Sequence, residues 1–157
     1  TSQVFGEAAY RLHKSWLATE AFGNLAYVRV NSDSFVESGG PAALTVAEAN
    51  TSVTFTTLGL RAQAPIPALG PWLMTARGSL GWQHAYNHIA PTSLMTFASG
   101  SAPFAIAGVP IAADTLLVEA GLDAQIYRNT VLALLYTGRI ASDASAHALK
   151  ANLAVKF

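Results

Sequence analysis

Histidine and aspartate side chains that could ligate a metal or act in acid–base chemistry occur in the second half of the chain. They are His84, His88, Asp114, Asp143 and His147. The spacing of His84 and His88 would place two ligands on one face of a helix. The segment that carries them is predicted to be a strand running into a loop, where this spacing has no special meaning. We therefore interpret them as polar loop residues, and we predict no catalytic residue, no metal and no cofactor.

Charged side chains of both signs recur on one side of the predicted strands. They are Glu7, Arg11, Glu20, Arg61, Arg77, Glu119, Asp123, Arg139, Lys150 and Lys156. Successive residues of a strand point to opposite faces, so these side chains are expected to share one face of a sheet. Two interpretations remain open: they contact a further polypeptide segment, or they only satisfy one another.

The composition limits what can cover these elements. Of the 157 residues, 52% are hydrophobic and 11% are charged, whereas soluble domains carry roughly 25% charged residues. Much of the surface must therefore face something other than water. No apolar run approaches the ~18 residues of a transmembrane helix, and the longest, such as 130–136, have the length of a strand.

Charge and cysteine content exclude further classes. The formal net charge is zero and there is no basic run, so the chain lacks the electrostatic footprint of a nucleic-acid-binding protein. Cysteine is absent, which excludes thiol catalysis, zinc–thiolate sites and disulfides. The absence is also compatible with passage through an oxidising compartment.

Alternation with a period of two residues is the main structural signal. It is clearest in 149–157, 115–126 and 3–13. Four further segments, 16–30, 53–64, 72–86 and 130–141, are also predicted to be strands. In 115–126 the predicted apolar face contains Leu116, Val118, Ala120, Leu122, Ala124 and Ile126.

The connections between these strands alternate in length. Those around 12–16, 65–71 and 127–130 are short, whereas 31–52 and 87–113 are long and 142–147 is intermediate. Alternate connections of an up-and-down barrel lie at the same end. The alternation in length therefore places the short turns at one end of the barrel and the longer loops at the other, as in outer-membrane barrels.

A membrane barrel fits better than a soluble barrel. The polar faces carry few charges for surfaces that would meet bulk water. Aromatic residues lie near strand ends, where interfacial girdles belong: Tyr10, Trp16, Trp72, Trp82, Tyr86, Tyr127, Tyr136 and Phe157. We predict an all-β fold, an antiparallel up-and-down transmembrane β-barrel.

Seven predicted strands cannot close such a barrel. Bacterial single-chain barrels have an even number of at least eight strands. We therefore expect that 1–157 is part of a longer polypeptide, that its N-terminal strands have been removed, or that an eighth strand lies in 95–111.

The order of several short motifs resembles the C-terminal part of the autotransporter β-domain, the translocator of type V secretion. The motifs are QVFGEAAYR (3–11), LAYVR (25–29), FVESGG (35–40), TLGLR (57–61), ARGSLGWQH (76–84), FAIAGVP (104–110), VEAGLD (118–123) and LKANLAVKF (149–157). The resemblance implies that 1–157 is the C-terminal portion of a twelve-stranded barrel in the cell outer membrane and ends on its last strand. A linker helix is threaded through the pore of such a barrel, which exports its own N-terminal passenger to the cell surface. Its implied partners are outer-membrane lipid, lipopolysaccharide, and the missing strands, helix and passenger.

Two other functions compete with export. A passive porin is compatible with a polar interior, and an outer-membrane hydrolase would need a converging acid–base set at the barrel rim. The C-terminal Phe157, with Val155 and Leu153 on the same face, resembles the signal that the barrel assembly machinery reads on its clients. Phe157 would also serve as an interfacial anchor.

Overall fold

The computed structural model describes residues 1–14, 16–67, 72–87 and 90–156. The strands are β1 (Ser2–Lys14), β2 (Leu17–Ser32), β3 (Phe35–Val36), β4 (Leu44–Val46), β5 (Ala49–Ile66), β6 (Leu73–Ala85), β7 (Thr92–Phe97), β8 (Phe104–Ala107), β9 (Asp114–Tyr127), β10 (Thr130–Ala141) and β11 (Ser145–Val155). None of the described residues belongs to a helix long and apolar enough to cross a membrane.

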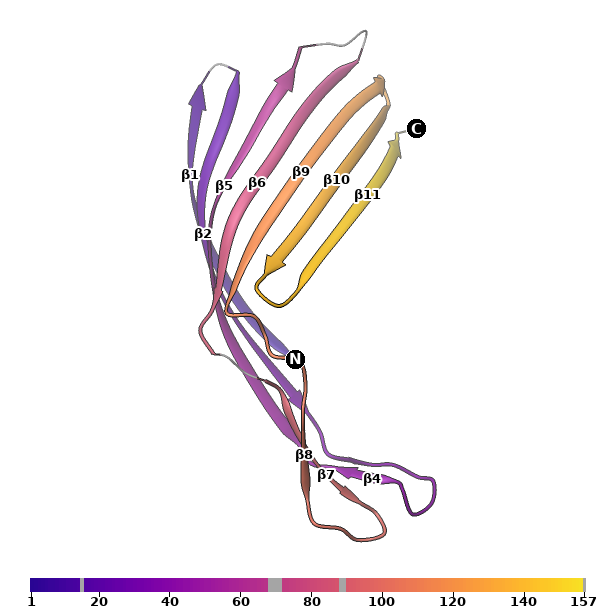
Figure 1. The fold of residues 1–157 in the computed structure, drawn as a ribbon. Helices are drawn as coiled ribbons and strands as arrows, with labels where there is room; N and C mark the ends of the chain where they lie inside the picture. Colours follow the sequence, from indigo (N-terminus) through magenta and orange to yellow (C-terminus); the bar gives the residue numbers. More distant parts are fainter. Residues whose placement is uncertain (15, 68–71, 88–89, 157) are drawn as a thin grey trace. The chain divides into compact units, whose positions relative to one another are not determined.

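Seven strands form one sheet in the order β1-β2-β5-β6-β9-β10-β11, which is the order along the chain (Figure 1). The pairs β6–β9, β9–β10 and β10–β11 are antiparallel. The predicted all-β antiparallel fold and its seven strands are therefore confirmed. In the described part of the chain, β1 and β11 each have a single neighbour in this sheet, so the sheet is not closed.

The last connection is shorter than the sequence predicts. Residues 142–147 are expected to form a loop of intermediate length, but β11 begins at Ser145 and pairs in register with β10 from Ile140↔Ser145 onward. The turn is closed by the Ala141 N–H, which donates to the Ala144 carbonyl at 2.9 Å. The sequence does not predict that 145–148 belong to this strand, because Ser, Ala, His and Ala show little alternation between apolar and polar residues.

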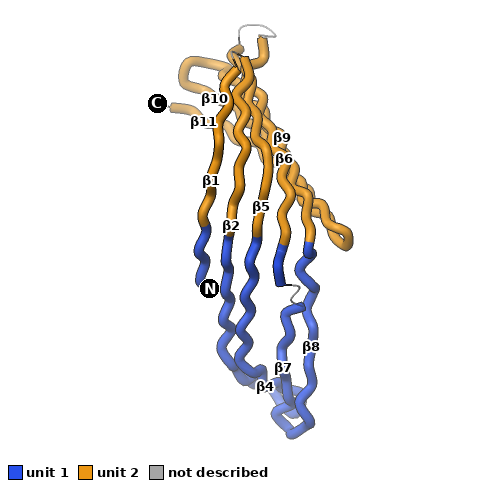
Figure 2. The backbone as a smooth tube through the Cα atoms, turned by 90° about the vertical axis from the view of Figure 1, so that its left-hand side faces the viewer, with its two compact units in different colours: residues 1–5, 26–55, 85–113 blue, residues 6–25, 56–84, 114–157 orange. Residues whose placement is uncertain are grey.

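The chain divides into two compact units (Figure 2). Unit 1 contains Thr1–Phe5, Ala26–Phe55 and Ala85–Ala113, and unit 2 contains Gly6–Leu25, Thr56–His84 and Asp114–Phe157.

Unit 1 holds a four-stranded sheet in the order β3-β4-β7-β8, built from the two long connections. Strands β4 and β7 pair antiparallel, with Thr45 opposite Thr96. Gly39, Gly40 and Gly100 have φ values of 146°, 82° and 92°, which permit the turns of the β3–β4 and β7–β8 hairpins. The strands within 95–111 therefore belong to this small sheet, and neither is an eighth strand of the large one.

Unit 2 shows how the cross-strand register sorts residue types between two faces. Leu122 lies opposite Ala76 on β6 and Leu134 on β10. The adjacent residue, Gly121, lies opposite Arg77 and Leu135. Because successive residues of a strand alternate between faces, the first row lies on an apolar face and the second on the face that carries charge.

Candidate functional site

We call the "polar face" the side of unit 2 that carries the charged side chains of its strands. Contacts and register place these residues on it: Glu7, Arg11, Glu20, Arg61, Arg77, Glu119, Asp123, Arg139 and Lys150. The "apolar face" is the other side, with Leu80, Trp82, Leu116, Leu122, Leu134 and Leu149.

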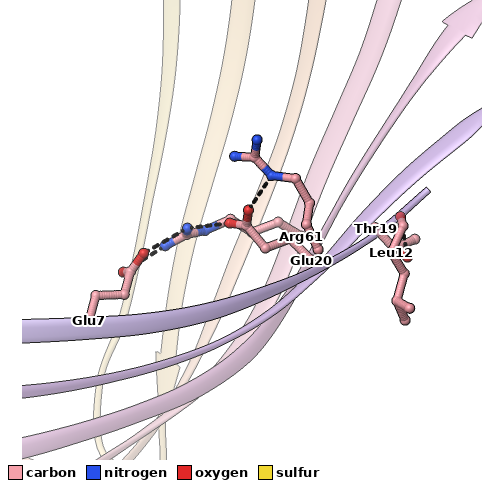
Figure 3. A network of polar contacts seen from close by, with 6 residues as sticks. Glu7, Leu12, Thr19, Glu20 and Arg61 are labelled. Atoms are coloured by element: carbon pink, nitrogen blue, oxygen red, sulfur yellow. Dashed lines mark hydrogen bonds and ion pairs between the residues drawn. The ribbon is translucent and has the colours of Figure 1, made fainter.

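Arg61 on β5 is the centre of a network of ion pairs on the polar face (Figure 3). Its guanidinium donates two hydrogen bonds of 2.9 Å to the two carboxylate oxygens of Glu7 on β1. It donates a third, also 2.9 Å, to Glu20 on β2. Arg11 Nε donates to the other oxygen of Glu20 at 2.8 Å. The network joins three strands through bidentate geometry, which only an arginine can supply.

The ring of Phe22 on β2 packs against this network. The Arg61 guanidinium carbon lies 3.9 Å from the centroid of the ring, a cation–π contact. The ring also lies against Gly59, where a Cβ atom would come 2.6 Å from Phe22 Cζ and 2.7 Å from the Leu80 carbonyl oxygen. Only glycine therefore fits beside the ring at this position.

A similar arrangement holds Arg77 on β6. Its side chain crosses the Cα of Gly121 on β9, where a Cβ would lie 2.5 Å from Arg77 Nε. This path brings Arg77 to within 3.5 Å of the Asp123 carboxylate. Sequence alternation alone could not reveal this route, because it depends on the register Arg77↔Gly121.

Polar contacts continue across the sheet to β10. The Arg139 guanidinium donates to Gln83 Oε1 at 3.0 Å, and Gln83 Nε2 donates to the Thr57 hydroxyl at 3.3 Å. Between the two arginine groups the polar face has a hollow of about 460 Å³, lined by Arg11, Glu20, Arg61, Arg77, Ser79 and Glu119 among others. The sequence placed these charges on one face but could not predict their partners.

The other residues that the sequence predicts as interior or assembly residues lie in several places. Glu119 lines the hollow beside Arg77, and Lys150 lies opposite Leu135 in the β10–β11 register. Lys156 follows β11, where its backbone N–H donates to the Asn129 carbonyl at 2.9 Å. Leu153 and Val155 pair with Leu132 and Thr130. Phe157 lies outside the described residues.

The histidines and aspartates considered as a metal or hydrolytic set are distributed over separate places. Trp82 Nε1 donates to Asp114 Oδ1 at 2.9 Å, and His84 Nδ1 lies 2.8 Å from the same oxygen. His147 Nδ1 lies 2.8 Å from the Tyr136 hydroxyl. Asp143 lies in the β10–β11 turn, and His88 lies outside the described residues. Among the described residues, no three His, Asp or Glu side chains are placed to hold a metal ion.

The leucine side chains of the apolar face are more exposed than is favourable in water. Leu149 is 77% exposed and Leu153 is 62% exposed, and further leucines on this face are similarly open. Trp72, the residue before β6, and Trp82, near the end of β6, are also exposed. A strand rises ~3.3 Å per residue and is tilted by ~40° in an outer-membrane barrel. The ten residues from Trp72 to Trp82 therefore span ~25 Å along the membrane normal, which is the height of the apolar band of such a barrel. An exposed apolar face of this extent marks a surface that a membrane or another protein covers.

Comparison with known proteins agrees with this geometry. The family model described as the autotransporter β-domain matches residues 1–137. The chain belongs to the autotransporter β-domain family. Two relatives, each named as an extracellular serine protease of Serratia marcescens, are 34% and 32% identical over 157 residues. The match covers the whole of this chain and about 15% of each relative.

Membership of the family assigns the domain its place and general role. The autotransporter β-domain is the translocator of the outer membrane, and it exports a passenger carried in the same polypeptide. The predicted family, fold class and outer-membrane location are therefore confirmed. The word protease in the relatives' names describes whole proteins of which the matched part is a small share.

Proposed function

We propose that this autotransporter β-domain anchors in the outer membrane and gives its own N-terminal passenger a route to the cell surface, without chemistry of its own. The observation that carries the proposal is the division of one sheet into a face of mutually paired charges and a face of exposed leucines. Such a sheet closes with its charges inward, around a wet pore, and its leucines toward lipid. Lipopolysaccharide would then contact the outward face beside the Trp82–Asp114–His84 group.

Closure of the barrel requires strands beyond those of the seven-stranded sheet. Among the described residues, the outer edges of β1 and β11 have no partner strand in this sheet, and each unpaired backbone group costs several kcal/mol in hydrocarbon. We propose a twelve-stranded barrel in which further strands of the same polypeptide pair with both edges. The ten predicted charged residues, including Lys156, would face its interior.

Surface exposure of the passenger in the full-length protein tests the proposal. Protease added to intact cells should remove the passenger from cells that carry the native protein. A folded barrel whose passenger stays in the periplasm would contradict export, and a steady conductance from the whole polypeptide would favour the porin alternative. A secreted serine protease is the first passenger to assay, given the relatives' name.

The C-terminal residue gives a second test, on assembly. Phe157 continues the alternation of Leu153 and Val155 with an aromatic side chain. A strand that ends in this way could be bound by the barrel assembly machinery through strand addition. In the full-length protein, deletion of Phe157 should reduce insertion into the outer membrane severalfold in cells. Refolding into detergent should be nearly unchanged. An equal loss in the two assays would assign Phe157 to packing, and Phe157→Tyr, which keeps an aromatic terminus, serves as the control.

A further inference from the structure

The small sheet of unit 1 has an exposed edge along β3, in the first of the two long connections. Among the described residues, β4 is the only strand that pairs with β3 in this sheet. Every residue of 31–40 is exposed, and Phe35 and Val36 are 54% and 68% exposed. We call 33–37 the "β3 edge". Long connections lie on the extracellular side of outer-membrane barrels, so the β3 edge offers backbone hydrogen-bonding groups to a molecule outside the cell.

An apolar row crosses the small sheet and ends at the β3 edge. Phe35 on β3 lies opposite Val46 on β4. Met95 on β7 lies opposite Val46 on one side and opposite Phe104 on the other. Phe35, Val46 and Met95 also line a hollow of about 510 Å³ within unit 1, and Asp33 lines the same hollow. A strand added at the β3 edge would extend this row with one apolar side chain opposite Phe35.

Acidic side chains flank Phe35 on both sides. Asp33 precedes it by two residues and Glu37 follows it by two. Glu37 stays in the β3–β4 register, where its N–H donates to the Leu44 carbonyl at 2.8 Å. Neither carboxylate forms an ion pair with a described residue. Arg29 is the single lysine or arginine of unit 1, and its Nε donates to a neighbouring asparagine at 3.0 Å. The β3 edge therefore has an apolar centre between two negative charges that lack a basic partner.

We propose that the β3 edge binds an extended basic peptide of another molecule, of the pattern Lys-x-Leu-x-Lys, as an added antiparallel strand. The leucine lies opposite Phe35, and the first and last lysines lie opposite Glu37 and Asp33. Main-chain hydrogen bonds supply affinity in such a complex, and alternate side chains supply specificity. Two copies of this chain paired in the same way would place Asp33 against Glu37, and like charges directly opposite each other repel. The inference goes beyond export and needs only the outer-membrane location of the domain.

Binding of fluorescent peptides to the full-length protein tests the proposal. The protein is held in nanodiscs of phosphatidylcholine, because lipopolysaccharide is anionic and would bind any basic peptide. The probe contains Lys-Thr-Leu-Thr-Lys, and the control peptide contains the same residues in the order Lys-Lys-Thr-Thr-Leu. Fluorescence anisotropy should show saturable binding of the probe and at least tenfold weaker binding of the control. Equal affinity for the two peptides would overturn the proposal, as would a probe that does not saturate by about 1 mM.

Substitutions at the β3 edge test each contact. Phe35→Ala should weaken binding of the probe at least tenfold, whereas Val109→Ala, at an exposed residue of unit 1 outside the small sheet, should leave it unchanged. Asp33→Asn combined with Glu37→Gln should weaken it about tenfold in total. Glutamine keeps an acceptor for the Leu44 N–H, which lies 3.1 Å from Glu37 Oε2. Heat-modifiable gel mobility confirms that each barrel is folded. Unchanged affinity in Phe35→Ala or in the double variant would overturn the proposal.

A charge swap tests the direction of the added strand. In Asp33→Lys the preferred peptide should change from Lys-Thr-Leu-Thr-Lys to Lys-Thr-Leu-Thr-Glu, because the last residue of an antiparallel peptide lies opposite residue 33. The reversed order, Glu-Thr-Leu-Thr-Lys, should gain no affinity. A preference of Asp33→Lys for the reversed order would overturn the antiparallel pairing.

Two further measurements separate the other possible occupants of the β3 edge. Probe binding that appears only after protease has removed the passenger would assign the edge to the passenger. Disulfide-linked dimers of Val36→Cys in outer membranes would assign it to a second copy of this chain, since 1–157 contains no native cysteine. We expect neither result, and either one would overturn the choice of partner. If the passenger still reaches the cell surface in those cells, the export function stands and only this inference fails.

Discussion

An arginine in place of Leu122 is expected to destabilise the closed barrel by about 2–4 kcal/mol. Leu122 lies near the middle of β9, in a row with Ala76 and Leu134 on the apolar face. A guanidinium there meets hydrocarbon and has no charged partner in that row. The free energy of unfolding from lipid bilayers, measured by denaturant titration of the complete barrel, gives the effect.

Thr137→Arg is the matched control. Thr137 lies on the polar face of β10, directly opposite Glu119, so a new guanidinium finds a carboxylate. We expect a change within about 0.5 kcal/mol, as for ordinary exposed substitutions. If Thr137→Arg costs as much as Leu122→Arg, the polar face does not line a wet interior. If neither variant changes stability, the apolar face does not meet lipid.

The sequence was sufficient for strands in which alternation extends over ten or more residues. The prediction of 115–126 and 130–141 falls within one residue of β9 and β10. It was insufficient for the sheet of unit 1, because β3 has two residues and β4 has three, too few to show a period. These strands exist because the two long connections pair with each other through β4 and β7.

The candidate site was predictable in its composition and not in its contacts. Alternation placed Glu7, Glu20 and Arg61 on one face, but their joining depends on the order β1-β2-β5. The aliphatic residues Val131, Ala133 and Leu135 of β10 were not recognised as part of that face, because a strand apolar on both sides shows no alternation. Gly59 and Gly121 appeared as ordinary strand glycines in the sequence, because the side chains that cross them come from neighbouring strands.

Gly59→Ala is expected to destabilise the barrel by about 1–3 kcal/mol, the usual cost of overpacking. The added methyl group would lie 2.6 Å from Phe22 Cζ and 2.7 Å from the Leu80 carbonyl oxygen. The ring can rotate away only by leaving the Arg61 guanidinium, and the carbonyl is fixed in the sheet between β5 and β6. The loss should appear as a lower denaturation midpoint with an unchanged slope.

Gly81→Ala controls for the general effect of alanine in a strand. A Cβ at Gly81 has its nearest neighbour at 3.5 Å, an ordinary contact, so this variant should match or slightly exceed the native stability. Combining Gly59→Ala with Phe22→Leu separates the two clashes. If the ring is the main obstacle, the second change restores most of the loss; if the Leu80 carbonyl is, the double variant stays as unstable as Gly59→Ala. Native stability in Gly59→Ala alone would show that the ring does not lie against Gly59 in the membrane.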